Sequence, residues 1–227
     1  MNDLIAIDTE TGGAGPTQCT THAMLMLAAY YRTETVESTF KVYILPTPGL
    51  IVDPLAAAVN GYTPEEWQRR EAVPEYAACI RFFSWLLTAR RTLFPDWQQD
   101  RRRCRVRFLA HNSAHDEGFL NAMLARNGLL DEVYAPRDVL AADTSEAAAA
   151  ARWECSMHTL MALQRIGIGG IPTGASLNHC IAWLTQTSVE DTIAIRGTHD
   201  SGADAQWAYQ TMERLIAAAK QTMILPV

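Results

Sequence analysis

The first part of the chain contains short apolar runs separated by polar breaks. Residues 4–11, with the sequence LIAIDTET, are apolar until they end in acids, and residues 23–31 and 40–45 form two similar runs. Their length, lack of helical spacing and polar or Pro-Gly boundaries predict three β-strands. We expect these strands to form an antiparallel meander, with the acids of the first strand at an edge of the sheet.

Helical spacing of apolar residues begins near Asp53. Residues 53–59, 64–70 and 74–90 show this spacing, and prolines stand at or near their first turns, where the missing N–H group costs nothing. The segment RVRFLAH, residues 105–111, predicts a further strand. The following segment predicts a helix that ends at Asn127-Gly128.

The C-terminal half is predicted to be mainly helical. We expect helices over residues 146–167, which are rich in alanine, over residues 175–186, and over residues 201–220. Residues 95–104 are polar and charged and indicate a surface loop, and residues 167–174 (GIGGIPTG) indicate another. Residues 133–142 are ambiguous, with a strand ending near Asp143 as one interpretation.

Composition indicates a soluble globular protein. The chain has 227 residues, 48% of them apolar and 19% charged, which favours one domain spanning residues 1–227. No apolar run approaches the roughly 20 residues of a membrane span, and acids near the N-terminus do not fit a signal peptide. We therefore expect a cytoplasmic protein without a membrane partner. Five cysteines without a CxxC pair indicate reduced, structural thiols.

The formal net charge of −6 argues against a broad, non-specific grip on duplex phosphates, which usually requires a basic domain. It does not exclude nucleic-acid chemistry. An acidic site recruits divalent cations, and these cations then carry the positive charge to the phosphate.

Three separated segments place acids at junctions between predicted elements. They are IDTET with Asp8 and Glu10, HNSAHDEGF with Asp116, and THDSGADA with His199 and Asp204. Residues i and i+2 of a strand point to the same face, so Asp8 and Glu10 project side by side. Two such like charges are costly unless a cation lies between them.

Converging carboxylates suit Mg²⁺ or Mn²⁺, which prefer oxygen ligands, and do not suit zinc. Two such ions, about 3.5–4 Å apart, can hold the attacking and leaving oxygens of an in-line phosphoryl displacement. A histidine with an ordinary pKa of about 6.5 can deprotonate the water. The sequence thus predicts a two-ion hydrolytic site.

The three motifs resemble those of the DEDD exonucleases of the DnaQ-like group, in the subclass with a histidine in the third motif (DEDDh). DTETGG looks like the first motif, LAHNSAHDEGFL like the second and HDSGADA like the third, in the family's order. The resemblance implies an α/β ribonuclease H-like fold, with a mixed sheet of about five strands flanked by helices. It also implies that Asp8, Glu10 and Asp204 hold one metal ion. Asp8 would bridge to a second ion supported by Asp116, and His199 would be the general base.

The segment VNGYTPEE, residues 59–66, is similar to the part of this family that lies beside the terminal nucleotide. The residues that we expect against the substrate are Thr11, Gly61, Tyr62 and Asn112. The chain departs from the family in two places. His115 stands where the second motif commonly has an aromatic residue, and the span from Asp116 to Asp204 is long enough to hold a substrate-shaping insertion.

Several residues have a structural interpretation beside the functional one. His115 is a rival general base to His199, and Asp200 is a rival ligand to Asp204, although a helix-start acid is the favoured interpretation. We expect Asn112 to fix the strand-to-helix junction through side-chain hydrogen bonds. The arginines at positions 101–103 are solvated or bind phosphate. Four tryptophans at helical spacings suit core packing: Trp67, Trp85, Trp153 and Trp207.

The sequence therefore predicts a 3′-to-5′ exonuclease that acts on nucleic-acid 3′ ends, with single-stranded DNA favoured over RNA. The alternatives are an exoribonuclease of the ribonuclease T or oligoribonuclease type and a non-catalytic nucleic-acid-binding module. The clustered acids argue against a pure binding role, because they are costly to keep. A polymerase or homodimer partner is compatible with the sequence, but no feature supports either one.

Overall fold

The computed structural model describes residues 3–95, 106–130, 133, 153–196 and 200–224. Within these ranges the strands are β1 (Leu4–Thr11), β2 (Met24–Arg32), β3 (Glu37–Tyr43), β4 (Arg107–Ala110) and β5 (Trp153–Cys155). They form one sheet in the order β3-β2-β1-β4-β5. The pairs β1–β2 and β2–β3 are antiparallel, whereas β1–β4 and β4–β5 are parallel. This confirms both the predicted antiparallel meander and the mixed five-stranded α/β sheet.

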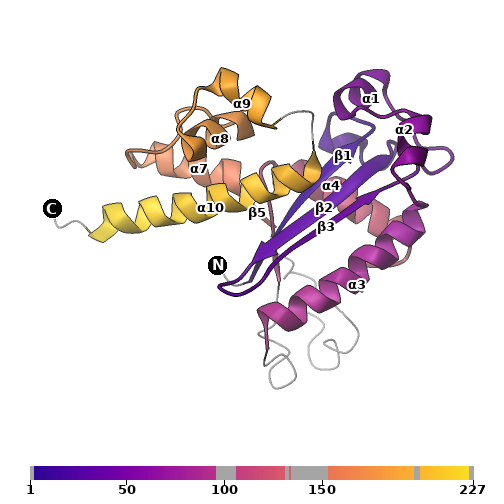
Figure 1. Cartoon of the computed structure of the whole chain (residues 1–227), viewed down its shortest axis with the longest axis horizontal. Helices are drawn as coiled ribbons and strands as arrows, with labels where there is room; N and C mark the ends of the chain where they lie inside the picture. The colour runs from indigo at the N-terminus through magenta and orange to yellow at the C-terminus, as the bar shows by residue number, and fades with distance from the viewer. Residues whose placement is uncertain (1–2, 96–105, 131–132, 134–152, 197–199, 225–227) are drawn as a thin grey trace.

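Helices cover both faces of this sheet (Figure 1). In chain order they are the 3₁₀-helix η1 (Pro16–Gln18) and the α-helices α1 (Pro54–Asn60), α2 (Pro64–Arg69), α3 (Glu75–Leu93), α4 (Ser113–Arg126), α7 (Ser156–Arg165), α8 (Leu177–Thr185), α9 (Val189–Arg196) and α10 (Ser201–Ile224). The starts of the early helices follow from their caps. The Asp53 carboxylate accepts from Leu55 N at 2.7 Å, and the Thr63 hydroxyl accepts from Glu66 N at 3.1 Å.

The alternation of side chains along β1 assigns each residue to one layer of the fold. Leu4 and Ala6 pack with Ala205 and Tyr209 of α10. The intervening Ile5 and Ile7 belong to the larger core, which the strand period of two requires. That larger core includes Phe82 of α3 and Phe119 of α4. Residues 8 and 10 therefore continue the row that faces α10.

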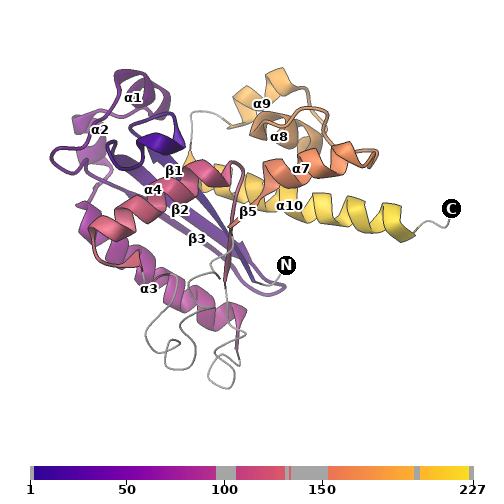
Figure 2. The same cartoon turned by 180° about the vertical axis from the view of Figure 1, so that it is seen from behind.

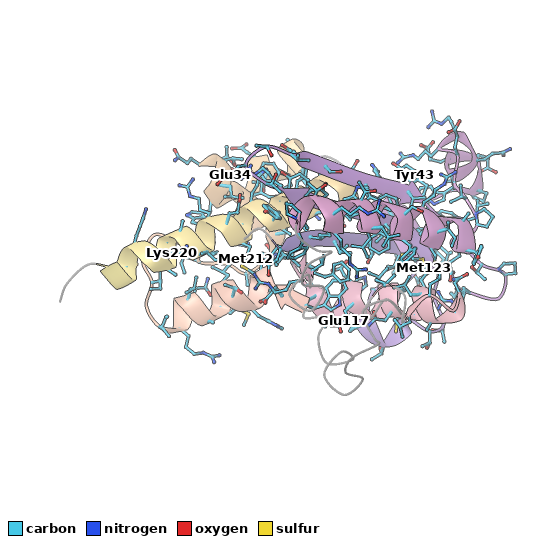
Figure 3. The ribbon with its side chains drawn as sticks, turned by 90° about the horizontal axis from the view of Figure 1, so that it is seen from below. Glu34, Tyr43, Glu117, Met123, Met212 and Lys220 are labelled. Atoms are coloured by element: carbon cyan, nitrogen blue, oxygen red, sulfur yellow. The ribbon has the colours of Figure 1, made fainter. Side chains whose placement is uncertain are left out.

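The two layers can be followed in Figure 3, where Met212 lies on α10 and Met123 on α4. Helices α7 and α8 pack on α10, and α9 packs on α8. Figures 1 and 2 show the C-terminal end of β1 between two groups of helices, α1 and α2 on one side and α7, α8 and α9 on the other. Among the described residues no helix is long and apolar enough to cross a membrane.

Most predicted elements are confirmed, but the expected helix over residues 146–167 is wrong in part. Trp153–Cys155 forms β5 through parallel pairing with Phe108, Leu109 and Ala110, and only from Ser156 onward is the segment helical. Helix α9 was not predicted. The predicted loop over 95–104 and the ambiguous segment 133–142 lie almost entirely outside the described residues, as do the arginines at positions 101–103.

Packing of the tryptophans and cysteines follows the expectation. Trp67 is fully buried, and the other three tryptophans pack at the margins of the core clusters. The cysteines that the structure describes are all free thiols, namely Cys19, Cys79, Cys155 and Cys180. Cys104 lies outside the described residues.

Candidate active site

The first motif ends β1 on the layer that faces α10. Asp8 pairs with Ala28 of β2 and Glu10 pairs with Met26, and the register shifts after Glu10. Glu10 is buried and Asp8 is half-buried. The small side chain of Ala28, directly opposite Asp8, adds little bulk beside that carboxylate. The strand thus delivers two acids, side by side, to the face covered by α10.

Asp204 completes a group of three acids, called here the acid triad. Carboxylate oxygens of Asp8, Glu10 and Asp204 all lie within 4.8 Å of one another. Asp204 lies in the first turn of α10 and is only 1% exposed. The unpaired N–H groups of a helix start favour a negative charge there. The triad therefore joins one end of the central strand to the start of the last helix.

Arg196 closes the acid triad from the side of α9. Its Nε donates to Asp204 Oδ1 at 2.8 Å, and its Nη2 donates to Asp204 Oδ2. Its Nη1 donates to the side-chain oxygen of Asn178 on α8, at 3.1 Å. The side chain of Arg196 is only 15% exposed. Two-point pairing of this kind is the stronger form of an arginine–carboxylate bond.

Asp116 comes from the opposite layer, in the first turn of α4. Its Oδ1 accepts from both the backbone N–H and the hydroxyl of Thr9, each at 2.9 Å. Asp116 is 5% exposed. It lies outside the group within 4.8 Å, although its charge acts on Asp8. Four acids thus meet around the end of β1, with three on one face and the fourth fixed to Thr9.

The acids disfavour each other's charge. Burial is the main cause that raises the pKa of Glu10 to about 8 and the pKa of Asp116 to about 7. Desolvation, followed by the charges of Asp116, Glu10 and Asp204, raises the pKa of Asp8 well above its ordinary value. Like charges that share a buried site behave in this way. A cation bound among them would remove the repulsion.

The donor set fits a hard divalent cation. Each ligand atom of the acid triad is a carboxylate oxygen, which Mg²⁺ and Mn²⁺ prefer. Among the described residues, the guanidinium of Arg196 pairs with Asp204, and its charge opposes the rise in the pKa of Asp8 and Glu10. One guanidinium charge does not balance three carboxylates. The site is therefore electrostatically suited to a metal ion, which supplies more charge in less space.

Two histidines near the acids differ in what their ring nitrogens can do. His111 has Nδ1 2.9 Å from Ser156 Oγ and Nε2 2.9 Å from the carbonyl oxygen of Ala175. Both nitrogens are engaged, so His111 is poorly placed to accept a proton from water. His115, on α4, has Nε2 3.3 Å from Thr11 Oγ1 and packs against Phe119. Burial lowers the pKa of His115. His199 lies outside the described residues.

The residues expected against substrate lie around the same strand end. Thr11 is buried, and its backbone oxygen accepts from Asn60 Nδ2 at 2.8 Å. Gly61 ends α1 in the left-handed conformation with φ 65°. Tyr62 packs edge-on against Trp67, with ring centroids 5.0 Å apart. Asn60 therefore ties the predicted substrate segment to β1, a contact that the sequence did not reveal.

We expected side-chain hydrogen bonds of Asn112 to fix the strand-to-helix junction, and the capping bond that would do so is absent. Asn112 occupies the N-cap position of α4, but its side chain makes no capping hydrogen bond and is exposed. The first turn of α4 is instead tied down by Asp116 through Thr9. The side chain of Asn112 therefore faces solvent at the start of α4.

Glycine at position 12 permits the close approach that brings α1 beside the site. A Cβ atom there would lie 2.6 Å from the carbonyl oxygen of Ile51 and 3.0 Å from Cα of Val52. Asp53 N donates to Gly12 O at 2.8 Å. Any larger residue would force the two segments apart. The glycine of the first motif thus fixes the start of α1 relative to β1.

Asp200 acts as a helix-start acid. Its Oδ1 accepts from the backbone N–H groups of Gly202 and Ala203, at 2.9 and 3.3 Å, and its Oδ2 accepts from Lys41 Nζ at 2.7 Å. Asp200 does not belong to the acid triad. Its carboxylate is therefore engaged in starting α10 and in pairing with β3.

Solved structures of exonuclease I share this fold. The E. coli enzyme in complex with a dA16 oligonucleotide matches with a TM-score of 0.64, covering 94% of this chain and 40% of the exonuclease chain at 15% identity. Its complex with a dT13 oligonucleotide matches with a TM-score of 0.64, covering 97% and 42% at 15% identity. Apo exonuclease I gives 0.62, covering 99% and 47% at 16% identity.

The chain thus spans less than half of the length of the exonuclease I chains that it matches. At such low identity the likeness establishes the fold alone. No protein-family model matches the chain, and no curated protein matches it in sequence.

Proposed function

We propose that this protein is a metal-dependent 3′-to-5′ exonuclease of the DEDDh type that releases nucleoside monophosphates from single-stranded DNA. The observation that carries the proposal is the acid triad, whose carboxylate oxygens lie within 4.8 Å of one another. It stands at the end of the central strand of a ribonuclease H-like sheet. Asp116 lies next to it, fixed by Thr9.

The four acids divide between two proposed metal positions. Asp8, Glu10 and Asp204 would hold one divalent ion, Mg²⁺ or Mn²⁺, and Asp8 together with Asp116 would hold a second. When bound, such ions stabilise charge on a phosphoryl group and lower the pKa of a water. The two hydrogen bonds from Thr9 orient Asp116, and the start of α10 orients Asp204.

The proton of the attacking water needs an acceptor. We assign this role to His199, with His115 as the rival candidate. The water oxygen attacks phosphorus, the bond from phosphorus to the 3′ oxygen of the preceding nucleotide breaks, and that oxygen takes up a proton. The histidine that accepts the first proton can return it. His199→Gln and His115→Gln, compared side by side, separate the two assignments through their loss of kcat.

The preference for DNA rests on the oligonucleotides bound to a solved structure of this fold, and the aromatic contact in this chain supports a single-stranded polymer. E. coli exonuclease I, which has this fold, is bound to dA16 and dT13 oligonucleotides in its solved complexes. In this chain, Tyr62 stands near the end of β1, and Thr11, Gly61 and Asn112 are the other proposed substrate contacts. An aromatic side chain stacks on a base without regard to its identity. We propose that all these residues act within one domain spanning residues 1–227.

The test uses two labelled forms of one single-stranded DNA, one labelled at the 5′ end and one at the 3′ end, and RNA of matching sequence. With Mg²⁺ or Mn²⁺, the 3′ label is expected to leave at once as a mononucleotide, while the 5′ label moves down a ladder. Asp8→Asn should abolish both signals.

Asp3→Asn is the matched control, because Asp3 pairs with Arg107 before β1 begins and does not belong to the acid triad. It should leave the rate unchanged. Immediate release of the 5′ label would contradict the proposed direction. Faster shortening of RNA would assign an exoribonuclease, and no shortening of either polymer with any metal would leave a binding module.

A further inference from the structure

A positive charge of the protein itself lies against the acid triad. Arg196 binds both carboxylate oxygens of Asp204, and its charge also acts on Asp8 and Glu10. We propose that Arg196 is a built-in counter-ion that keeps the acid triad assembled before a divalent cation binds, and that it competes with that cation for Asp204. The inference rests on the proposed function only in taking the triad to be a metal site.

Competition follows from where the guanidinium lies. Both oxygens of Asp204 already accept hydrogen bonds from Arg196. A cation that binds the triad needs an oxygen of Asp204, and it would then stand beside a second positive charge. In a buried site that repulsion is only weakly screened. Arg196 therefore has to give up part of its contact with Asp204 when the cation enters.

The position of Arg196 is itself fixed by a neutral partner. Arg196 is the last residue of α9, and α9 packs on α8. Asn178 of α8 accepts from Nη1 at 3.1 Å. This third contact aims the guanidinium at the triad but leaves no negative charge behind when the arginine moves. Asn178 thus acts as a positioning residue for Arg196.

The counter-ion also explains how the metal-free chain tolerates the triad. Asp204 is 1% exposed, and a buried carboxylate without a partner charge is strongly destabilising. Arg196 supplies one such partner charge. Removal of the arginine should therefore weaken the metal-free protein and strengthen its affinity for the cation, because the cation no longer has to displace a competitor. These opposite signs distinguish competition from a simple structural role.

The experiment measures Mn²⁺ binding to the full chain by the electron paramagnetic resonance signal of free Mn²⁺, and thermal unfolding with EDTA and with saturating Mn²⁺. Arg196→Met is expected to bind Mn²⁺ about tenfold more tightly, within the usual range of coupling between two sites. Its unfolding temperature should fall in EDTA and approach the wild-type value with Mn²⁺. Arg196→Lys, which keeps the charge, should restore part of the EDTA stability.

Arg107→Met is the matched control. Arg107 also binds a carboxylate at two points, but it pairs with Asp3 rather than with the triad. Its loss should lower the unfolding temperature equally with and without Mn²⁺ and leave the affinity unchanged. If Arg196→Met does not fold, Asn178→Ala provides the second test, and we expect the same direction of change with a smaller size. Mn²⁺ affinity that is unchanged or weaker in these variants would overturn the inference.

Failure of this inference and failure of the proposed function are distinguishable. Suppose that the wild-type protein binds Mn²⁺ and Arg196→Met binds it more tightly, while neither protein shortens DNA or RNA. The counter-ion role of Arg196 is then supported, and the exonuclease activity is contradicted. If the wild type shortens DNA and Arg196→Met binds Mn²⁺ no more tightly, the exonuclease activity is supported and the counter-ion role of Arg196 is contradicted. Absence of Mn²⁺ binding in every variant would overturn the counter-ion.

Discussion

Thr9 and Asp116 join the two layers of the site, because the backbone amide and the hydroxyl of Thr9 both donate to the same carboxylate oxygen. Thr9 stands between Asp8 and Glu10 on β1, but its side chain points to the layer of α4. The residue between the two acids of the first motif thus holds the acid of the second.

Thr9→Val should lower kcat/KM on single-stranded DNA about tenfold, because a hydrogen bond to a charged group contributes roughly 1.5–3 kcal/mol. Valine keeps the shape of threonine and leaves the backbone donor intact. Steady-state kinetics check the value. Thr88→Val, which removes an exposed hydroxyl on α3 that bonds only Ser84 O, should change nothing. An equal loss in both variants would show that Thr9 has no special role.

Asp8→Asn and Asp3→Asn should change stability in opposite directions when metal is absent. Burial and, after it, the neighbouring like charges raise the pKa of Asp8, so a neutral amide removes the cost of a buried charge and the repulsion. In EDTA the unfolding temperature of Asp8→Asn should rise by about 3 °C, which corresponds to a gain of roughly 1 kcal/mol in the free energy of unfolding. Asp3→Asn loses the ion pair with Arg107 and should unfold at a lower temperature. Calorimetry measures the unfolding temperature of both variants. A lower unfolding temperature for Asp8→Asn would argue against electrostatic strain in the triad.

Tyr62→Ala should raise KM for single-stranded DNA about tenfold with little change in kcat, because stacking of a base on an aromatic ring contributes roughly 1–3 kcal/mol. Tyr62→Phe keeps the ring and should behave like the wild type. Tyr76 is an exposed tyrosine on α3, 60% accessible, and Tyr76→Ala is the control. If Tyr62→Phe is as impaired as Tyr62→Ala, the hydroxyl rather than the ring contacts the substrate.

Stability should fall as the pH drops through the range of His111. Burial lowers the pKa of His111 below its ordinary value of 6.5, so the unfolded chain binds the proton more readily than the folded one. The contribution is complete above pH of about 6.5 and is lost as the pH falls from there toward the lower folded-state pKa. Urea unfolding at several pH values should therefore give a shallower slope for His111→Gln than for the wild type. Parallel curves would contradict the prediction.

Local patterns in the sequence were enough to predict strands β1 to β4 and the alternation of β1. The period of two in LIAIDTET places Asp8 and Glu10 on one face, and the structure shows the same row packing against α10. Likewise, the helix start near Ser201 follows from the apolar side of that helix. These features depend on neighbours within a few residues, so they can be predicted from the sequence without knowledge of the tertiary structure.

The features that escaped prediction depend on distant partners. The β5 strand has three residues after an alanine-rich run, and its extended form comes from pairing with β4. Helix α9 is short and rich in β-branched residues such as Val189 and Thr192, which weaken a helical signal. The pairing of Arg196 with Asp204 depends on α9, so it was also hidden. The bonds from Thr9 to Asp116 span 107 positions, beyond any local pattern.

The sheet order has a consequence for synthesis of the chain on the ribosome. β1 is made before the other four strands of the sheet but lies in its middle, between β2 and β4. Its pairing with β2 can form early, whereas β4 and the start of α10 emerge much later. Until then Asp8 and Glu10 have neither Asp204 nor Arg196 beside them. A nascent chain therefore carries the first motif without an assembled acid triad, and the triad forms only once the last helix has joined the sheet.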